Sequence, residues 1–98
     1  MLNSYLQKFP SDFSFGVATS SYQIEGTDFG GCGRSHWDDF ADQPGRVFEG
    51  QNGQIACDHY HRWPEDLDLV AEAGFDAYRF SFSWPRLLPE ENTKLNPE

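Results

Sequence analysis

The feature that most constrains the fold is a helical pattern that ends at a glycine and is followed at once by a strand pattern. Apolar residues in the segment 58–73 recur at spacings of three and four, which predicts a helix with one apolar face. These residues are Tyr60, Trp63, Leu67, Val70 and Ala71. Gly74 is a typical helix stop. From Asp76 to Trp84, large aromatic residues alternate with smaller or polar ones, which predicts a strand.

Pro64 leaves the start of this helix open. A proline inside a helix removes one backbone hydrogen bond and collides with the preceding turn. The acidic residues that follow it, Glu65, Asp66 and Asp68, suit the first turn of a helix. We therefore expect a helix that either begins near Pro64 or is kinked there.

A second strand pattern lies near the N-terminus, so the chain has the order strand, helix, strand. Residues 13–20 are small and apolar, which predicts a buried strand. The order favours a parallel βαβ unit of the α/β class. The face with Tyr78, Phe80, Phe82 and Trp84 would then pack under helices, and the face with Ala77, Arg79, Ser81 and Ser83 would look into a barrel. A surface hairpin would alternate in the same way, but the preceding helix favours the parallel arrangement.

The segment between the first strand and the helix is predicted to be a long loop. Residues 26–57 hold seven of the nine glycines, a composition typical of loops. A short helical turn is expected over residues 35–40, since Ser35 can cap it. A loop of this length is more often functional than structural.

Size and charge exclude several classes of function. The chain has 98 residues, which suit one small domain but not a complete (β/α)8 barrel of about 200 to 400 residues. The formal net charge is −9 with only seven lysines and arginines. Without a basic patch, neither nucleic acid nor an anionic membrane is an expected partner.

The sequence favours a cytoplasmic protein with reduced thiols. No apolar run approaches the roughly 20 residues of a membrane-spanning helix. The segment Met1–Pro10 lacks the apolar core of a signal peptide. Cys32 and Cys57 are isolated in the sequence, so we expect free thiols rather than a disulfide or a metal site.

Two residues are candidates for a binding site. Gln23 follows the first predicted strand, at the edge where barrel enzymes build their sites, and an amide offers both a donor and an acceptor, so it can bridge two adjacent hydroxyl groups of a ligand. Arg79 lies on the small polar face of the second strand, where burial would require a carboxylate partner. The alternatives are an amide that only satisfies its own loop and an exposed cation on an edge strand.

Other polar residues are expected to be structural. Any pair could be chosen among the sixteen acidic residues, so each tempting carboxylate is expected to be a cap or a surface charge. The tempting ones are Glu25, Asp38, Asp39 and Asp58. His59 and His61 would point about 200° apart on a helix, too far to share a metal ion. The glycines at 30, 31 and 33 lack the strand and helix context of a phosphate-binding loop.

The chain resembles glycoside hydrolase family 1, the β-glucosidase family, from Phe9 to its end. The main likeness is the segment Phe13–Thr27, in which aromatic, small and polar residues stand in the order typical of the family. Further similar segments are Ser35–Phe40, Pro44–Val47, Ala56–Arg62, Ala77–Ser81 and Ser83–Arg86.

The resemblance implies the N-terminal portion of a (β/α)8 TIM barrel, with its first two strands and first helix. Family members hydrolyse β-glycosides with retention and need no cofactor or metal. The resemblance implies that Gln23 hydrogen-bonds the hydroxyls of the glycone, the sugar that is released. It also implies that Arg79 supports the nucleophilic glutamate. Glu25 matches neither catalytic glutamate of the family.

Both catalytic glutamates of the family are missing here. The family carries its acid/base in an Asn-Glu-Pro motif and its nucleophile in a Glu-Asn-Gly motif, and neither occurs in residues 1–98; the nearest matches are Glu91-Asn92 before a threonine and Asn96-Pro97. We therefore expect one fragment of a catalytic barrel that acts on β-glycosides only as part of the intact enzyme. The alternatives are a sugar-binding module without catalysis and an inactive remnant.

Overall fold

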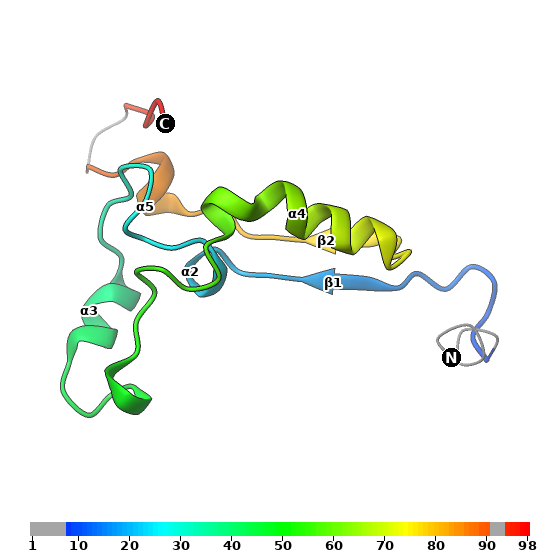
Figure 1. The fold of residues 1–98 in the computed structure, drawn as a ribbon, viewed down its shortest axis with the longest axis horizontal. Helices are drawn as coiled ribbons and strands as arrows, with labels where there is room; N and C mark the ends of the chain where they lie inside the picture. Colours follow the sequence, from blue (N-terminus) through cyan, green and yellow to red (C-terminus); the bar gives the residue numbers. More distant parts are fainter. Residues whose placement is uncertain (1–7, 91–93) are drawn as a thin grey trace.

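The computed structural model describes residues 8–90 and 94–98. Most of Met1–Pro10, the segment without a signal-peptide core, and the Glu91-Asn92 pair therefore lie outside the described residues. The elements in chain order are β1 (Gly16–Ala18), α2 (Ser21–Ile24), α3 (His36–Asp42), the 3-10 helix η1 (Phe48–Gly50), α4 (His59–Glu72), β2 (Ala77–Arg79) and α5 (Trp84–Leu87) (Figure 1).

The two strands pair in parallel, as the sequence pattern predicts. Val17 lies opposite Tyr78, and Ala18 lies opposite Arg79. The chain between the strands includes α4, which makes the unit a βαβ crossover. One further backbone bond, from Thr19 N to Arg79 O at 2.9 Å, continues the pairing just past the strand ends. Parallel strands need such a crossover, which explains why the helix lies between them in the sequence.

Both strands are shorter than the predicted spans 13–20 and 76–84. After β1 the chain turns into α2, and after β2 it leaves the ladder. The prediction that Trp84 extends the strand is wrong, because α5 begins there. Ser83 Oγ accepts from Arg86 N at 3.3 Å, and proline in the first turn presets the helical backbone.

Helix α4 matches the predicted segment 58–73 to within a residue, and it contains Pro64 in its interior. The helix therefore does not begin near the proline. Its N-cap, Asp58, has a left-handed backbone with φ 53°. The backbone N–H of Tyr60 lies in the first turn, where the helix itself provides no acceptor. It donates instead to Glu25 O at 3.1 Å. Gly74 follows the helix with φ +79°, the conformation of a helix-ending glycine.

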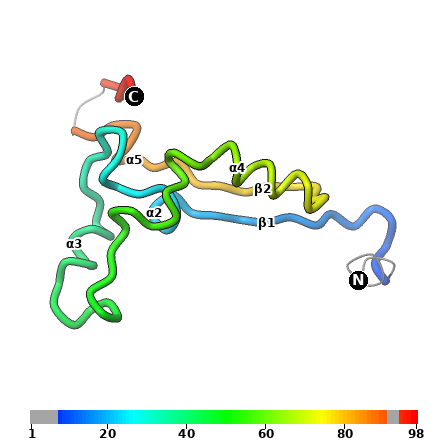
Figure 2. Tube along the Cα trace, viewed as in Figure 1, coloured from blue at the N-terminus to red at the C-terminus, as the bar shows by residue number. Residues whose placement is uncertain are grey.

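One face of the strand pair is covered by α4, and the other is open. Helix α4 runs back alongside both strands (Figures 1 and 2). Trp63 and Leu67 of α4 line a cavity together with Tyr78 and Phe80, so these two residues of the predicted aromatic face lie under the helix. Phe82 and Trp84, which are predicted for the same face, do not line this cavity and remain exposed. Ala18 and Arg79 are exposed on the alternate positions.

The long loop folds back on itself near the carboxyl ends of the strands. Ser35 caps α3 in a capping box with Asp38, which confirms the predicted helical turn. The loop's two arms are joined by backbone bonds from Thr27 N to Gly53 O at 2.9 Å and from Asp28 N to Gln54 O at 3.0 Å. The loop thus forms a unit beyond the strand ends, as the path in Figure 2 shows.

The described part of the chain has no fully buried apolar side chain. Large side chains from every region remain exposed, among them Phe82 at 75% and Trp84 at 70%. No helix in residues 8–90 and 94–98 combines the length and apolar character needed to cross a membrane.

Candidate functional site

Gln23 and Arg79 both lie at the carboxyl ends of the paired strands. Gln23 is in α2, which starts three residues after β1 ends, and Arg79 is the last residue of β2. In parallel α/β folds this edge is where sites form, because the loops that follow neighbouring strands converge there. The structure thus brings the segments of both predicted residues to one edge.

Gln23 is exposed, and only its side-chain oxygen is engaged in a local hydrogen bond. Ser20 Oγ donates to Gln23 Oε1 at 2.6 Å. Among the residues that the structure describes, none accepts a hydrogen bond from the amide nitrogen Nε2. That side chain therefore keeps two donors for a ligand, while its carbonyl oxygen is held by the neighbouring serine.

Arg79 presents an exposed guanidinium on the open face of the strand pair. It lies in register with Ala18, on the alternate position from Tyr78. Within residues 8–90 and 94–98 it has no carboxylate partner. An arginine is permanently charged and can donate to two carboxylate oxygens side by side, so this position suits an acidic group from another segment.

A cavity of about 470 Å³ opens beside this edge, between α2, α3 and the segment that follows β2. Its wall is both polar and aromatic, with Ser20, Tyr22, Trp37, Ser81 and Phe82 among the lining residues. Tyr22 and Trp37 lie with their rings 6.2 Å apart in a stacked arrangement. Neither Gln23 nor Arg79 is among the described residues that line the cavity.

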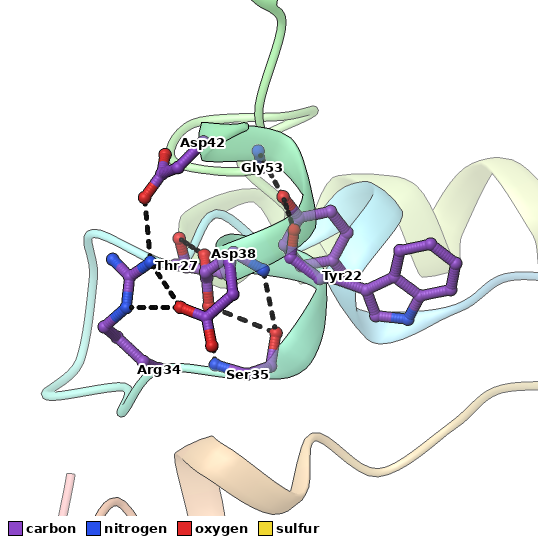
Figure 3. Close-up of polar contacts among 9 residues, drawn as sticks. Tyr22, Thr27, Arg34, Ser35, Asp38, Asp42 and Gly53 are labelled. Carbon is purple, nitrogen blue, oxygen red and sulfur yellow. Dashed lines mark hydrogen bonds and ion pairs between the residues drawn. The ribbon is translucent and has the colours of Figure 1, made fainter. Parts of the chain in front are cut away.

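Asp38 and Asp39 are engaged in local structure, and Figure 3 shows Asp38 beside its partners Thr27 and Ser35. Ser35 N donates to Asp38 Oδ2 at 2.7 Å, and Thr27 Oγ1 donates to Asp38 Oδ1 at 3.5 Å. Arg34 Nη2 lies 2.8 Å from Asp39 Oδ1 and 2.8 Å from Asp42 Oδ2. Both carboxylates thus have the structural roles expected of a cap and a surface charge.

The two histidines of α4 pair with different acids. His59 Nδ1 lies 2.7 Å from Asp66 Oδ2, and His61 Nδ1 lies 2.7 Å from Asp58 Oδ1. In the described part of the chain, no three potential ligands gather around a common point. The two imidazoles therefore take part in separate hydrogen bonds, each with its own carboxylate.

Glu25 forms an ion pair that sequence reasoning missed. Arg86 Nε donates to Glu25 Oε1 at 2.8 Å, and the two side chains are only 13% and 18% exposed. The same guanidinium donates to Phe29 O at 2.6 Å and Gly26 O at 3.1 Å. The partners lie 61 residues apart, so spacing could not join them. The sequence did mark both, since each stands in a segment that resembles the family.

Comparison with known proteins identifies close relatives. The family model described as "Glycosyl hydrolase family 1" matches residues 5–98. The "Beta-glucosidase" of Agrobacterium sp. is 57% identical over 96% of this chain and 21% of its own length. "Beta-glucosidase A" of Thermotoga maritima is 51% identical over 93% of this chain and 21% of its own. The chain therefore spans about a fifth of the length of these relatives.

Solved structures give the same result. The virulence factor SghA from Agrobacterium tumefaciens matches with a TM-score of 0.86 and 52% identity, over 96% of this chain and 21% of its own. SghA has also been solved with its substrate analog salicin. The family 1 β-glucosidase from Thermotoga maritima matches with a TM-score of 0.81 over 90% of this chain and 20% of its own. The strands and α4 are thus a fragment of a (β/α)8 barrel.

Proposed function

Because this chain belongs to glycosyl hydrolase family 1, we propose that it forms the N-terminal part of an enzyme that hydrolyses terminal β-D-glucosides with retention of configuration. The observation that carries the proposal is the family match over residues 5–98, together with the high identity to β-glucosidases. The position of Gln23 and Arg79 at the carboxyl edge of the strands supports it.

Retaining hydrolysis proceeds in two steps and needs two carboxyl groups. One attacks the anomeric carbon while the other protonates the leaving oxygen, and water then releases the covalent glycosyl intermediate. We propose that both groups come from segments beyond residues 1–98. The proposal is supported by the structural partners that hold Glu25, Asp38 and Asp39.

We propose that Gln23 positions the sugar and that Arg79 supports the nucleophilic carboxylate. The free donors of Gln23 would bind hydroxyls of the glycone and hold the anomeric carbon in place. The guanidinium of Arg79 would lie against the nucleophilic carboxylate and keep it ionised, since a nearby cation lowers the pKa of a carboxyl group. Without these two contacts the nucleophile would still be present, but it would be less well oriented.

The proposed substrates are neutral β-D-glucosides. The relatives include the "Beta-glucosidase" of Agrobacterium sp. and the "Beta-glucosidase A" of Thermotoga maritima. They also include a "1,4-beta-D-glucan glucohydrolase" of Thermotoga neapolitana. A Bacillus subtilis relative of 48% identity is the "Aryl-phospho-beta-D-glucosidase BglC". A comparison of an aryl β-glucoside with its 6-phosphate separates these two classes. A cytoplasmic location stays a prediction, which cell fractionation would test.

The experiment uses a chimera in which residues 1–98 replace the matching part of the 57% identical Agrobacterium sp. β-glucosidase. We expect the chimera to hydrolyse 4-nitrophenyl β-D-glucoside and to release β-glucose first, as followed by proton NMR. Gln23→Ala should lower kcat/KM by about 10- to 100-fold, because it removes hydrogen bonds to the sugar. Gln51→Ala, at an exposed position in the long loop, is the matched control.

The 98-residue chain alone should show no turnover. Turnover by the purified chain that Gln23→Ala abolishes would contradict this expectation. Binding of glucose by the chain without turnover would favour the sugar-binding alternative. A chimera that folds but does not hydrolyse any β-glycoside would overturn the proposed function.

A further inference from the structure

Helix α2, which carries Gln23, cannot hold its own position. It has only four residues, no buried side chain and no side-chain cap at its start. Isolated helices of this length are unstable in water. The orientation of Gln23 therefore depends on contacts that other segments make with α2. Tyr22 in the middle of the helix accepts from Gly53 N at 3.1 Å, and further contacts hold the two ends of the helix.

The start of α2 is attached to the segment after β2. Ser21 N donates to Ser81 Oγ at 2.8 Å. This bond satisfies one of the N–H groups that a helix start leaves without a partner. It is a single neutral hydrogen bond between exposed groups, so on its own it is a weak attachment.

The end of α2 is attached far more strongly, through Arg86. Glu25 is the C-cap of α2. Its carboxylate oxygen Oε1 accepts a hydrogen bond from Arg86 Nε at 2.8 Å. Two backbone carbonyls just after the helix accept from the terminal nitrogens of the same guanidinium: Nη1 donates to Phe29 O, and Nη2 donates to Gly26 O. The three acceptors, one carboxylate and two backbone carbonyls, belong to residues 25–29, so one guanidinium fixes the exit of α2 at three points.

Arg86 is itself held in place. It belongs to α5, whose start is fixed by the Ser83 cap. Its guanidinium carbon lies 4.7 Å from the centre of the Tyr60 ring, in a cation–π arrangement. Tyr60 N in turn donates to Glu25 O at 3.1 Å. The end of α2, the start of α4 and α5 thus meet at one guanidinium, which belongs to a side chain that is only 13% exposed.

From these contacts we propose that Arg86 is a positioning residue, which sets the orientation of Gln23 toward the sugar through Glu25, Gly26 and Phe29. The inference rests on the proposed role of Gln23 in glycone binding. A planar guanidinium can serve three acceptors in fixed directions, whereas a lysine amine is a single compact donor centre. Arg86→Lys therefore keeps the charge next to Glu25 but loses the three-point attachment.

The test is a double-mutant cycle in the chimera, with kcat/KM for 4-nitrophenyl β-D-glucoside as the readout. We expect Arg86→Lys alone to lower kcat/KM by about tenfold. In a Gln23→Ala background the same change should lower it by less than about twofold, because the residue through which Arg86 acts is gone. Arg62→Lys is the control, since Arg62 makes an exposed ion pair with Glu65.

A merely structural role would not produce this coupling. If Arg86→Lys lowers activity by the same factor in the Gln23→Ala background as in the chimera that keeps Gln23, the positioning role is overturned. If Gln23→Ala has no effect in an active chimera, both the role of Gln23 and the inference built on it fail. If Gln23→Ala lowers activity and Arg86→Lys does not, only the inference fails.

A second variant covers the case in which Arg86→Lys does not fold. Glu25→Gln keeps the size of the side chain and the two backbone acceptors, and it removes only the carboxylate from the three-point attachment. Circular dichroism confirms folding before the cycle with Gln23→Ala is measured. A smaller loss of kcat/KM in the Gln23→Ala background supports the proposal, and equal losses in both backgrounds overturn it.

Discussion

At the scale of single residues, the two cysteines differ in their surroundings and should differ in reactivity. Cys32 is half-buried, its Sγ lies 3.9 Å from Ser83 Oγ, and burial raises the pKa of its thiol. Cys57 is exposed. Since the thiolate is the reactive form, a raised pKa leaves less of it at a given pH. We expect iodoacetamide to modify Cys32 about tenfold more slowly than Cys57 at pH 8 in the chimera.

The rate for Cys32 should continue to rise at pH values above the ordinary thiol range, because its titration is displaced upward. Peptide-resolved mass spectrometry measures both rates in one sample. In urea the two rates should converge, because unfolding removes the burial of Cys32. Equal rates in the folded protein would contradict the position of Cys32 beside Ser83.

Residue roles could be predicted only where a local pattern or the family resemblance marked them. The capping role of Ser35 could be predicted from the residues next to it in the sequence. The structure confirms this role, since Ser35 and Asp38 form a capping box. The partner of Glu25 could not be predicted, because Arg86 lies 61 residues away and chain folding alone brings the two together. The binding role of Gln23 and the support role of Arg79 stay predictions.

At the scale of elements, Pro64 should weaken α4 locally. It lies inside a 14-residue helix, where it cannot donate to the carbonyl four residues before it. We expect Pro64→Ala to stabilise the helix by about 1–2 kcal/mol, less than the full difference in helix propensity because the unfolded chain also gains freedom. Amide hydrogen exchange of residues 59–72 in the chimera should slow by about 5- to 30-fold.

The matched change is Asp68→Ala, at an exposed position of the same helix. It should alter exchange in α4 by much less, because it restores no backbone hydrogen bond. Faster exchange after Pro64→Ala would show that contacts of the proline ring contribute more than the missing bond.

Element types were easier to predict than element ends. The three-and-four spacing placed α4 within a residue, because that pattern extends over most of the helix. Strand ends depend on whether a neighbouring strand continues, and the ladder between β1 and β2 covers only three residue pairs. The alternation up to Trp84 could not reveal that Ser83 and Pro85 start a new helix there.

At the scale of the whole molecule, the chain exposes more surface than a self-contained domain. Its accessible area is 7911 Å², whereas a compact protein of this mass exposes about 5,700 Å². Its radius of gyration is 17.1 Å, against about 13 Å for a compact domain of the same length. The aromatic side chains that would pack against other segments of a barrel have no such segments to contact here.

The last prediction follows from this excess of exposed apolar surface. We expect the isolated chain to associate reversibly and to melt without a cooperative transition, because its strand edges and aromatic side chains lack partners. The net charge of −9 opposes association, so association should increase as salt screens the repulsion. Sedimentation at two salt concentrations and calorimetry measure these properties, and a monomer with a sharp melt would contradict the prediction.

A partner that supplies the missing barrel segments should reverse the behaviour. When the remaining four-fifths of the Agrobacterium sp. relative is added as a separate chain, we expect a one-to-one complex, a cooperative melt and hydrolysis of 4-nitrophenyl β-D-glucoside. The physical reason is that the open face and edges of the strand pair are covered only when neighbouring strands and helices join them. If a one-to-one complex forms without activity, covering the strand pair is not enough to orient Gln23 and Arg79. If no complex forms, the exposed aromatic surface is not sufficient to bind the remaining barrel segments when they are on a separate chain.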